Sequence, residues 1–228
     1  MRSSTSNRAP VALAAWCILA QLAPSLAYAQ RYTFQMYGQS EGLTNLAPLA
    51  VLQDHAGFLW VGTQNGLFRY DGSRFEPFNI ADGLPASRVD SLYETPDGTV
   101  VAATPRGLAR HSGNRFAAFS GDLTTARREG IASDSDGRLL IATDAGLAAI
   151  GGSQVSVWTA GADRKISSVF RDTDGTVWAG CGDRLCVVRG DGLETVADEL
   201  PRQSWRCIRR DRAGNLWLLS DGRASRSA

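Results

Sequence analysis

With 228 residues, the chain can bury one large core or two small ones. Its 24 lysines and arginines almost balance 23 acids, which argues against a nucleic-acid-binding protein or a strongly charged partner surface. The 24 glycines indicate many turns.

The N-terminal region is predicted to be a cleaved secretory signal, residues 1–29. A basic start, Arg2 and Arg8, precedes an apolar segment from Pro10 to Leu22, and Ala27-Tyr28-Ala29 offers the small residues that signal peptidase requires. We therefore predict cleavage after Ala29 and a periplasmic location for residues 30–228. An inner-membrane anchor is the alternative, although the apolar segment is short for a full span.

Two further features complete the prediction of location. Trp16 precedes Cys17, where a lipoprotein site requires a small residue, so we do not expect lipidation. No later segment approaches about 18 consecutive apolar residues, so we expect no other membrane span. A periplasmic setting would permit disulfides.

A motif recurs along the mature region at a nearly fixed interval. It can be aligned on one glycine per copy, with steps of 41, 39, 38 and 39 residues between Gly57, Gly98, Gly137, Gly175 and Gly214. A constant period near forty residues is typical of a repeat architecture.

Positions at fixed offsets from these glycines share a chemical character. Three residues before the glycine is an acid or threonine, which predicts a type I turn: Asp54, Thr95, Asp134, Asp172 and Asp211. Seven residues before it, the side chains are small, and two and three residues after it they are apolar. The flanking apolar segments have the length of strands rather than helices.

Two more hairpin turns are predicted in the first repeat, at Gln64-Asn65-Gly66 and at Asp71-Gly72. Each repeat would then encode four short antiparallel strands. A four-stranded sheet repeated at this period is typical of a propeller blade, so we predict an all-β fold: a β-propeller with four complete blades and part of a fifth, in an incomplete ring. Stacked blades would bury Trp60, Trp178 and Trp217 between neighbours, and the small positions would allow the inner strands to crowd around an axis.

The first repeat resembles the two-component regulator propeller repeat. The resemblance rests on the pattern L-x-D-x-x-G-F-L-W-V-G-T-x-x-G-L-x-R-Y-D-G at Asp54 to Gly72 and its surroundings, with Glu41-Gly42-Leu43 before it and Asp82-Gly83-Leu84 after it. It extends over residues 31 to about 221, and the fifth repeat is expected to stop after its second strand. The WD40, kelch and sialidase patterns do not fit the spacing of these residues.

The resemblance implies a seven-bladed periplasmic sensor. In that family the propellers precede a β-sandwich, a membrane helix and an output domain, commonly a histidine kinase or a diguanylate cyclase. The chain contains none of these later parts, so we expect it to be the N-terminal portion of a longer sensor or the product of a truncated reading frame.

The cysteines are predicted to have structural roles. Cys181 and Cys186 flank the second hairpin turn of the fourth repeat, where we expect them to face each other across a four-residue loop and form a disulfide. Two free thiols are the alternative, and no histidine nearby supports a metal site. Cys207, at a small position, is expected to be a buried free thiol rather than a redox centre.

No catalytic or metal-binding constellation is evident. Asp134-Ser135-Asp136-Gly137 and Asp172-Thr173-Asp174-Gly175 begin like calcium loops but lack the remaining ligands, so we interpret them as turns. His55 and His111 occupy non-equivalent positions, and we expect both at the surface. We expect no cofactor and no catalytic activity of this chain alone.

Ligand contacts are expected at one end of the central channel, where the chain leads into each innermost strand. Residues in or near these segments form a basic and amide rim that could touch an anionic or sugar-like ligand, with a solvated rim as the alternative: Asn45, Arg88, Arg128, Lys165 and Arg206.

The leading prediction is thus a ligand-sensing periplasmic propeller of a transmembrane signal-transduction protein. Its partners would be a small molecule or glycan and the missing blades, anchor and output domain, with homodimerisation as another way to complete the ring and no nucleic acid. The alternatives are an extracytoplasmic lyase or hydrolase acting on polysaccharide, and a non-catalytic envelope scaffold.

Overall fold

The computed structural model describes residues 34–120, 123, 125, 127, 129–152, 154–160, 165–196 and 200–227. All strands among the described residues belong to the unit formed by residues 37–228. The predicted signal segment and its cleavage site lie outside the described residues. Within the described part, no helix is both long enough and apolar enough to cross a membrane.

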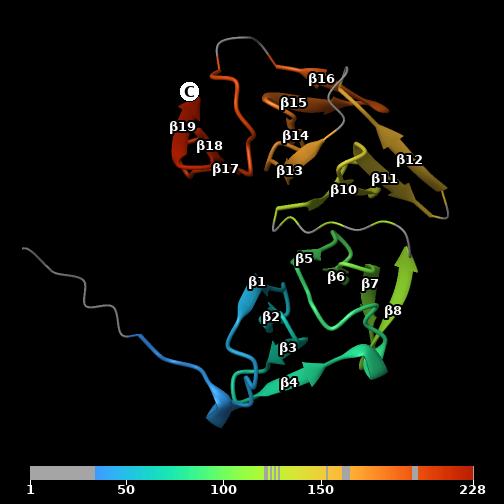
Figure 1. Cartoon of the computed structure of the whole chain (residues 1–228), viewed down its shortest axis with the longest axis vertical. Helices are drawn as coiled ribbons and strands as arrows, with labels where there is room; N and C mark the ends of the chain where they lie inside the picture. The colour runs from blue at the N-terminus through green and yellow to red at the C-terminus, as the bar shows by residue number, and fades with distance from the viewer. Residues whose placement is uncertain are drawn as a thin grey trace, which may run out of the picture. The chain divides into compact units, whose positions relative to one another are not determined.

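Five antiparallel sheets follow one another along the chain, and in each sheet the strands pair in sequence order (Figure 1). Sheet 1 contains β1 (Pro48–Gln53), β2 (Leu59–Thr63), β3 (Gly66–Tyr70) and β4 (Phe75–Phe78). Sheet 2 contains β5 (Ser91–Glu94), β6 (Val100–Thr104), β7 (Gly107–Ser112) and β8 (Arg115–Ser120). Sheet 3 contains β9 (Ile131–Ser133), β10 (Leu139–Ala142), β11 (Leu147–Gly151) and β12 (Gln154–Trp158).

Sheet 4 contains β13 (Ile166–Arg171), β14 (Val177–Cys181), β15 (Arg184–Arg189) and β16 (Gly192–Thr195). Sheet 5 contains β17 (Cys207–Arg210), β18 (Leu216–Ser220) and β19 (Arg223–Ser227). The expectation that the fifth repeat stops after its second strand is therefore wrong. A two-residue turn at Asp221-Gly222 returns the chain into β19, which pairs along the whole of β18.

The recurring glycine ends the turn between the first and second strand of each sheet. In sheet 1, Gly57 has a φ of 92°, which side chains strongly disfavour, and its amide donates to the Asp54 carbonyl at 3.0 Å. The Asp54 carboxylate accepts from the Phe58 amide at 2.9 Å and from the Trp60 indole Nε1 at 2.8 Å. The acid thus fixes both the turn and the orientation of the tryptophan six residues later.

The same acid–tryptophan pair recurs wherever both residues are present. The indole of Trp217 donates to Asp211 at 2.8 Å, and that of Trp178 donates to Asp172 at 3.3 Å. In sheet 3, where a leucine replaces the tryptophan, Asp134 accepts from Arg138 Nε at 2.7 Å instead.

Neighbouring sheets pack through two alternating positions on their second strands. The residue two after the glycine faces the preceding sheet, and the residue three after it faces the following sheet, because successive side chains in a strand point to opposite faces. Thus Trp60 of sheet 1 and Val100 of sheet 2 belong to one buried cluster, and Val101 of sheet 2 and Leu139 of sheet 3 belong to the next. Each fully buried aliphatic or aromatic side chain contributes about 1.5–3 kcal/mol.

The sheets at the two ends of this series each have a face with no neighbouring sheet among the described residues. Trp217 is 38% exposed, compared with 1% for Trp60 at the equivalent position. The prediction that Trp217 lies between sheets is therefore wrong, because sheet 5 is the last described sheet. At the other end, Tyr37 and Leu43 cover Phe68 and Phe75 of sheet 1.

His111 also departs from its predicted surface position. It lies in an aromatic cluster between sheets 1 and 2, with ring centroids 4.9 Å from Trp60 and 5.2 Å from Phe116. Burial, aided by the nearby Arg69 guanidinium, lowers its pKa below the ordinary value of 6.5. His55 is exposed as expected and forms an ion pair with Glu94.

Candidate functional site

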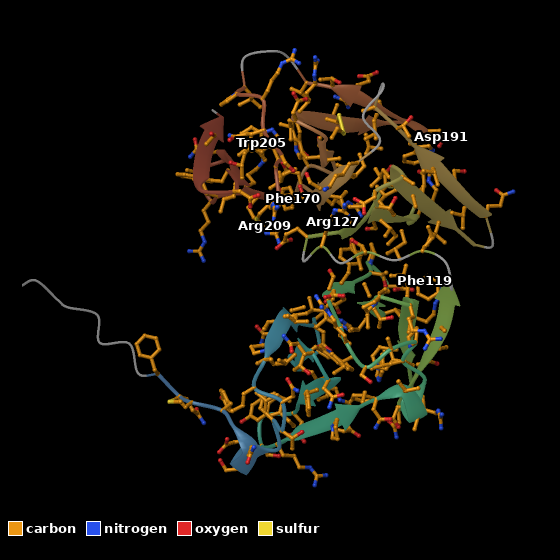
Figure 2. All side chains as sticks on the ribbon, viewed as in Figure 1. Phe119, Arg127, Phe170, Asp191, Trp205 and Arg209 are labelled. Carbon is orange, nitrogen blue, oxygen red and sulfur yellow. A yellow bond between two sulfur atoms is a disulfide. The ribbon has the colours of Figure 1, made fainter. Side chains whose placement is uncertain are left out.

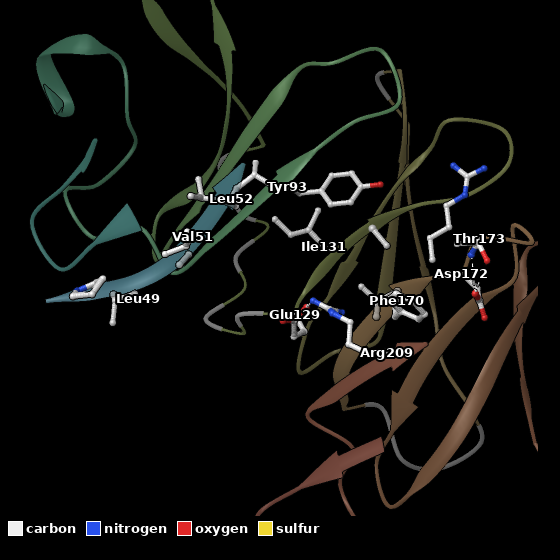
Figure 3. Close-up of a pocket in the computed structure, with 16 residues that line it drawn as sticks. Leu49, Val51, Leu52, Tyr93, Glu129, Ile131, Phe170, Asp172, Thr173 and Arg209 are labelled. Atoms are coloured by element: carbon white, nitrogen blue, oxygen red, sulfur yellow. Dashed lines mark hydrogen bonds and ion pairs between the residues drawn. The ribbon is translucent and has the colours of Figure 1, made fainter. Parts of the chain in front are cut away.

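The first strands of neighbouring sheets lie in contact and border a pocket of about 750 Å³ (Figure 3). Strands β1, β5, β9, β13 and β17, one from each sheet, all contribute residues to its lining. In repeats of this kind, the innermost strands of the blades come together in the same way around a central channel. A molecule in this cavity could therefore touch several sheets at once.

One side of the cavity carries a hydrogen-bond chain that crosses three sheets. The hydroxyl groups of Tyr93 (β5) and Ser133 (β9) lie 2.8 Å apart, and Arg171 Nη1 (β13) donates to the same Ser133 oxygen at 3.1 Å. Ser133 is fully buried, so its position is fixed. Among the described residues, no carboxylate forms an ion pair with Arg171, which leaves most of its N–H groups for another acceptor.

A charged pair that includes Arg209 of β17 also lines the cavity. Arg209 pairs with Glu129, stacks 5.4 Å from the ring centroid of Phe170, and donates to the Ile208 carbonyl at 2.9 Å. Figure 3 shows Glu129 and Arg209 next to each other, with Ile131 and Phe170 nearby. The guanidinium is held at several points and can present a defined charge to a ligand.

Asp172 also lines the cavity and is held by several hydrogen bonds. Burial opposes its ionisation, but hydrogen bonds from Arg210 Nε at 2.5 Å, the Thr173 amide at 2.7 Å and the Trp178 indole outweigh that effect, and its pKa is lowered. The Asp172-Thr173-Asp174-Gly175 segment therefore acts as a turn whose first carboxylate is occupied by protein donors, as predicted.

Apolar side chains complete the cavity. Leu49 and Val51 from β1 and Ile131 from β9 also line it, and Val51 is exposed although it is aliphatic. A phenol, the Arg171 guanidinium, which has no carboxylate partner among the described residues, and an apolar wall suit a small ligand with both polar and apolar faces, such as a sugar or an anionic solute.

The described residues of the predicted ligand-binding rim are not part of the lining of this cavity. Asn45 accepts from the Ala47 amide at 3.1 Å, and Arg88 pairs with Asp90 at 2.6 Å. Arg206 pairs with Asp221 at 2.7 Å, and Lys165 directly precedes β13. Arg128 lies outside the described residues, and a ligand-binding role for this set remains a prediction.

Sequence reasoning missed the polar residues that do line the cavity. Tyr93 and Arg209 both lie five residues before a repeat glycine, and Arg171 lies four before one. For Tyr93 and Arg209 a signal was available, because their position holds Leu52, Ala132 and Phe170 in the other repeats. The position of Arg171 is polar in every repeat and offered no such signal. A polar residue that interrupts an apolar column of an inner strand indicates a group facing the channel.

The disulfide between Cys181 and Cys186 forms, but not with the predicted geometry. The turn contains only Gly182 and Asp183, so Cys181 lies opposite Arg184 and Cys186 lies opposite Ala179. The two cysteines are diagonal neighbours, with Cα atoms 6.0 Å apart. Both are buried between sheets 3 and 4.

The disulfide occupies the place of a hydroxyl clamp found in the first three sheets. There a threonine at the position of Cys181 donates to the carbonyl of the glycine three residues later, at 2.8 Å in each case: Thr63, Thr104 and Thr143. Cys207 is a free thiol, as predicted, but it is only partly buried; burial raises the pKa of its thiol.

The comparisons with known proteins identify the fold. No family model matches this sequence, and no curated protein matches it. Among solved structures, the extracellular domain of one hybrid two-component system of B. thetaiotaomicron matches with a TM-score of 0.70 at 20% identity, over 87% of this chain and 31% of that one. A second such domain from the same organism matches with a TM-score of 0.68 at 21% identity, over 87% and 32%.

Similarity extends to propellers of another kind. Virginiamycin B lyase from Staphylococcus aureus matches with a TM-score of 0.64 at 12% identity, over 79% of this chain and 69% of the lyase. The chain spans about a third of the length of the two extracellular domains. Together with the five sheets and their shared cavity, these similarities identify the fold of this chain as a β-propeller.

Proposed function

We propose that this chain is part of the extracytoplasmic sensor propeller of a transmembrane signal-transduction protein. The sequence pattern around Asp54 to Gly72, the structural likeness to extracellular domains of two-component systems, and a disulfide suited to an oxidising compartment support this proposal. The output domain would be a histidine kinase or a diguanylate cyclase elsewhere in the full protein.

The observation that carries the proposal is the cavity formed by strands from five sheets. A ligand that contacts Tyr93, Arg171 and Arg209 would link sheets 2, 4 and 5 directly. Because the ligand would favour one arrangement of these sheets over others, its binding free energy would bias their packing. That is the physical requirement for passing a signal to a distant domain. The ligand class that fits is a small glycan or an anionic solute.

The ring is proposed to need further blades. The face of sheet 5 that carries Trp217 and Leu219 is exposed, whereas the corresponding faces of sheets 1–4 are covered by the next sheet. Additional blades of the parent protein would cover it and close the channel. A second copy of the chain is the alternative way to cover this face.

A thermal-shift screen with monosaccharides, oligosaccharides and organic anions tests ligand sensing. A ligand at 100 times its Kd should stabilise the protein by about 2.7 kcal/mol. Arg171→Gln and Tyr93→Phe should abolish or reduce the shift, while Arg74→Ala, at an exposed position that does not line the cavity, serves as a surface control. A shift that survives both cavity variants, or a screen without any stabilising compound, would contradict the proposal.

The coding sequence downstream of Ala228 provides an independent test. A β-sandwich, a membrane helix and a kinase or cyclase domain in the same reading frame are the expected result. A stop codon followed by unrelated genes would argue against the sensor assignment even if a ligand binds.

A further inference from the structure

A second cavity, of about 580 Å³, lies between sheets 2 and 3, separate from the inner-strand cavity. Val101, Leu139 and Ile150 form apolar parts of its lining, and Phe119 and Arg110 contribute an aromatic ring and a guanidinium. Figure 2 shows Phe119 on β8, and this ring packs against the buried cluster shared by the two sheets.

The equivalent space between sheets 1 and 2 is filled by aromatic rings. Trp60 lies 5.6 Å from Phe78, 4.9 Å from His111 and 6.0 Å from Phe116, measured between ring centroids. Trp60 and Phe78 follow Gly57 by 3 and 21 residues, and His111 and Phe116 follow the next repeat glycine by 13 and 18. These four ring positions are the reference for the comparison with the interface between sheets 2 and 3.

Between sheets 2 and 3, smaller side chains occupy the same four offsets. Val101 replaces the indole, Phe119 keeps its ring, and Ile150 and Val155 replace the histidine and phenylalanine. Val155 is 51% exposed, whereas Phe116 is 4% exposed. Because Val101 is much smaller than tryptophan, the interface is left open at the place where an indole would lie.

The same interface also lacks a carboxylate at the cross-strand position that Glu76 holds in sheet 1. In sheet 1, Arg69 pairs with Glu76 on the neighbouring strand at 2.5 Å. At the equivalent pair in sheet 2, Arg110 lies opposite Ala117. Arg110 stacks 4.4 Å from the ring centroid of Phe119, and no ion pair to it occurs among the described residues. The guanidinium thus lines the cavity without a cross-strand acid, while the Asp97 carboxylate, which also lines the cavity, accepts hydrogen bonds from the Thr95 hydroxyl and the Thr99 amide.

We propose that the cavity between sheets 2 and 3 binds a small aromatic carboxylate. The ring of the ligand would take the space that the Trp60 indole fills in the preceding interface, against Val101 and Leu139. The carboxylate would pair with Arg110, as Glu76 pairs with Arg69, in the charge-assisted geometry that guanidinium groups favour. This inference does not depend on the sensor role, because it uses a different cavity and different residues.

Isothermal titration with indole-3-acetate tests the proposal, with neutral indole and acetate as the two half-ligands. Indole-3-acetate should bind at least tenfold more tightly than either half-ligand. Val101→Trp, which restores the missing indole, should abolish binding without lowering the Tm. Ala117→Glu, at an exposed position, should weaken indole-3-acetate at least tenfold by supplying an internal carboxylate to Arg110.

A matched control keeps the test decisive. Ala118→Glu, one residue along β8 and on the opposite face, reports the effect of an added charge alone. It should leave binding unchanged. Absence of binding to the wild-type chain, or unchanged affinity in Ala117→Glu, would overturn the proposal even if Val101→Trp failed to fold.

Discussion

Replacing Trp60 with alanine should destabilise the protein far more than the same change at Trp217. The two residues occupy the same position in their repeats, and each indole donates to a turn aspartate at 2.8 Å. They differ in what covers them: Trp60 is 1% exposed beneath sheet 2, and Trp217 is 38% exposed. The pair therefore isolates the contribution of packing between sheets.

The expected magnitudes follow from burial. Truncation of a buried tryptophan to alanine costs about 3–5 kcal/mol, including the cavity it leaves, which corresponds to a fall in Tm of roughly 6–20 °C for a domain of this size. Trp217→Ala loses the indole hydrogen bond and part of the burial, and should cost about 1–2 kcal/mol. Trp60→Phe, which keeps a ring but no donor, should fall between the two.

Urea unfolding followed by circular dichroism measures these differences. The m-value serves as the control, because an unchanged m-value indicates that the variant unfolds over the same exposed surface. Equal losses of stability at Trp60 and Trp217 would refute the reasoning. That result would mean that sheet 2 does not cover Trp60, or that another part of the chain covers Trp217.

Three other predictions concern contacts between sheets and within one hairpin. Burial lowers the pKa of His111 below 6.5, so at acidic pH the unfolded state takes up a proton that the folded state does not. The free energy of unfolding of the wild type should therefore fall relative to that of His111→Ile as the pH drops from about 7.5 to 5.5. Parallel curves of stability against pH would contradict this. Replacing both Cys181 and Cys186 with alanine should lower the free energy of unfolding by about 2 kcal/mol. Combining Cys181→Thr with Cys186→Val should recover about 1 kcal/mol, because the threonine can form the hydroxyl clamp. If the two double variants unfold at the same urea concentration, the clamp does not form. Arg138 pairs with Asp191 of sheet 4 at 2.5 Å and with two acids of its own sheet, so Arg138→Met should cost about 1 kcal/mol, with a loss that shrinks in 1 M NaCl; a salt-independent loss would assign the effect to packing instead.

The repeat and its turns could be predicted from sequence because they are local. The acid three residues before Gly57 and the glycine itself act within one turn, and the alternation of apolar residues in Leu59 to Thr63 acts within one strand. These features require no knowledge of neighbouring sheets, so the order and type of the strands followed directly.

The errors arose where the outcome depends on a neighbour. Trp217 has the same local sequence context as Trp60, and only the presence or absence of a following sheet decides whether it is buried. His111 is polar, but its position 13 residues after Gly98 points it at the preceding sheet. The register at Cys181 depends on the length of the next turn, which contains two residues, Gly182 and Asp183, where a four-residue loop was expected.

The candidate site was the least predictable part for the same reason. Tyr93, Ser133 and Arg171 are about forty residues apart in sequence, and their hydrogen bonds exist only once three sheets are side by side. Each residue alone resembles an ordinary strand position. Their shared location follows from the packing of the first strands, which the sequence pattern implied without indicating which side chains would meet.

A double-mutant cycle between Trp60 and Phe116 tests most directly whether the repeats pack face to face. The two rings belong to different sheets and lie 6.0 Å apart at 90°. The cycle uses Trp60→Leu, Phe116→Leu and the double variant, with unfolding free energies from urea titration. We predict a coupling energy of about 0.5–1.5 kcal/mol; a coupling energy indistinguishable from zero would contradict the packing on which both cavities depend.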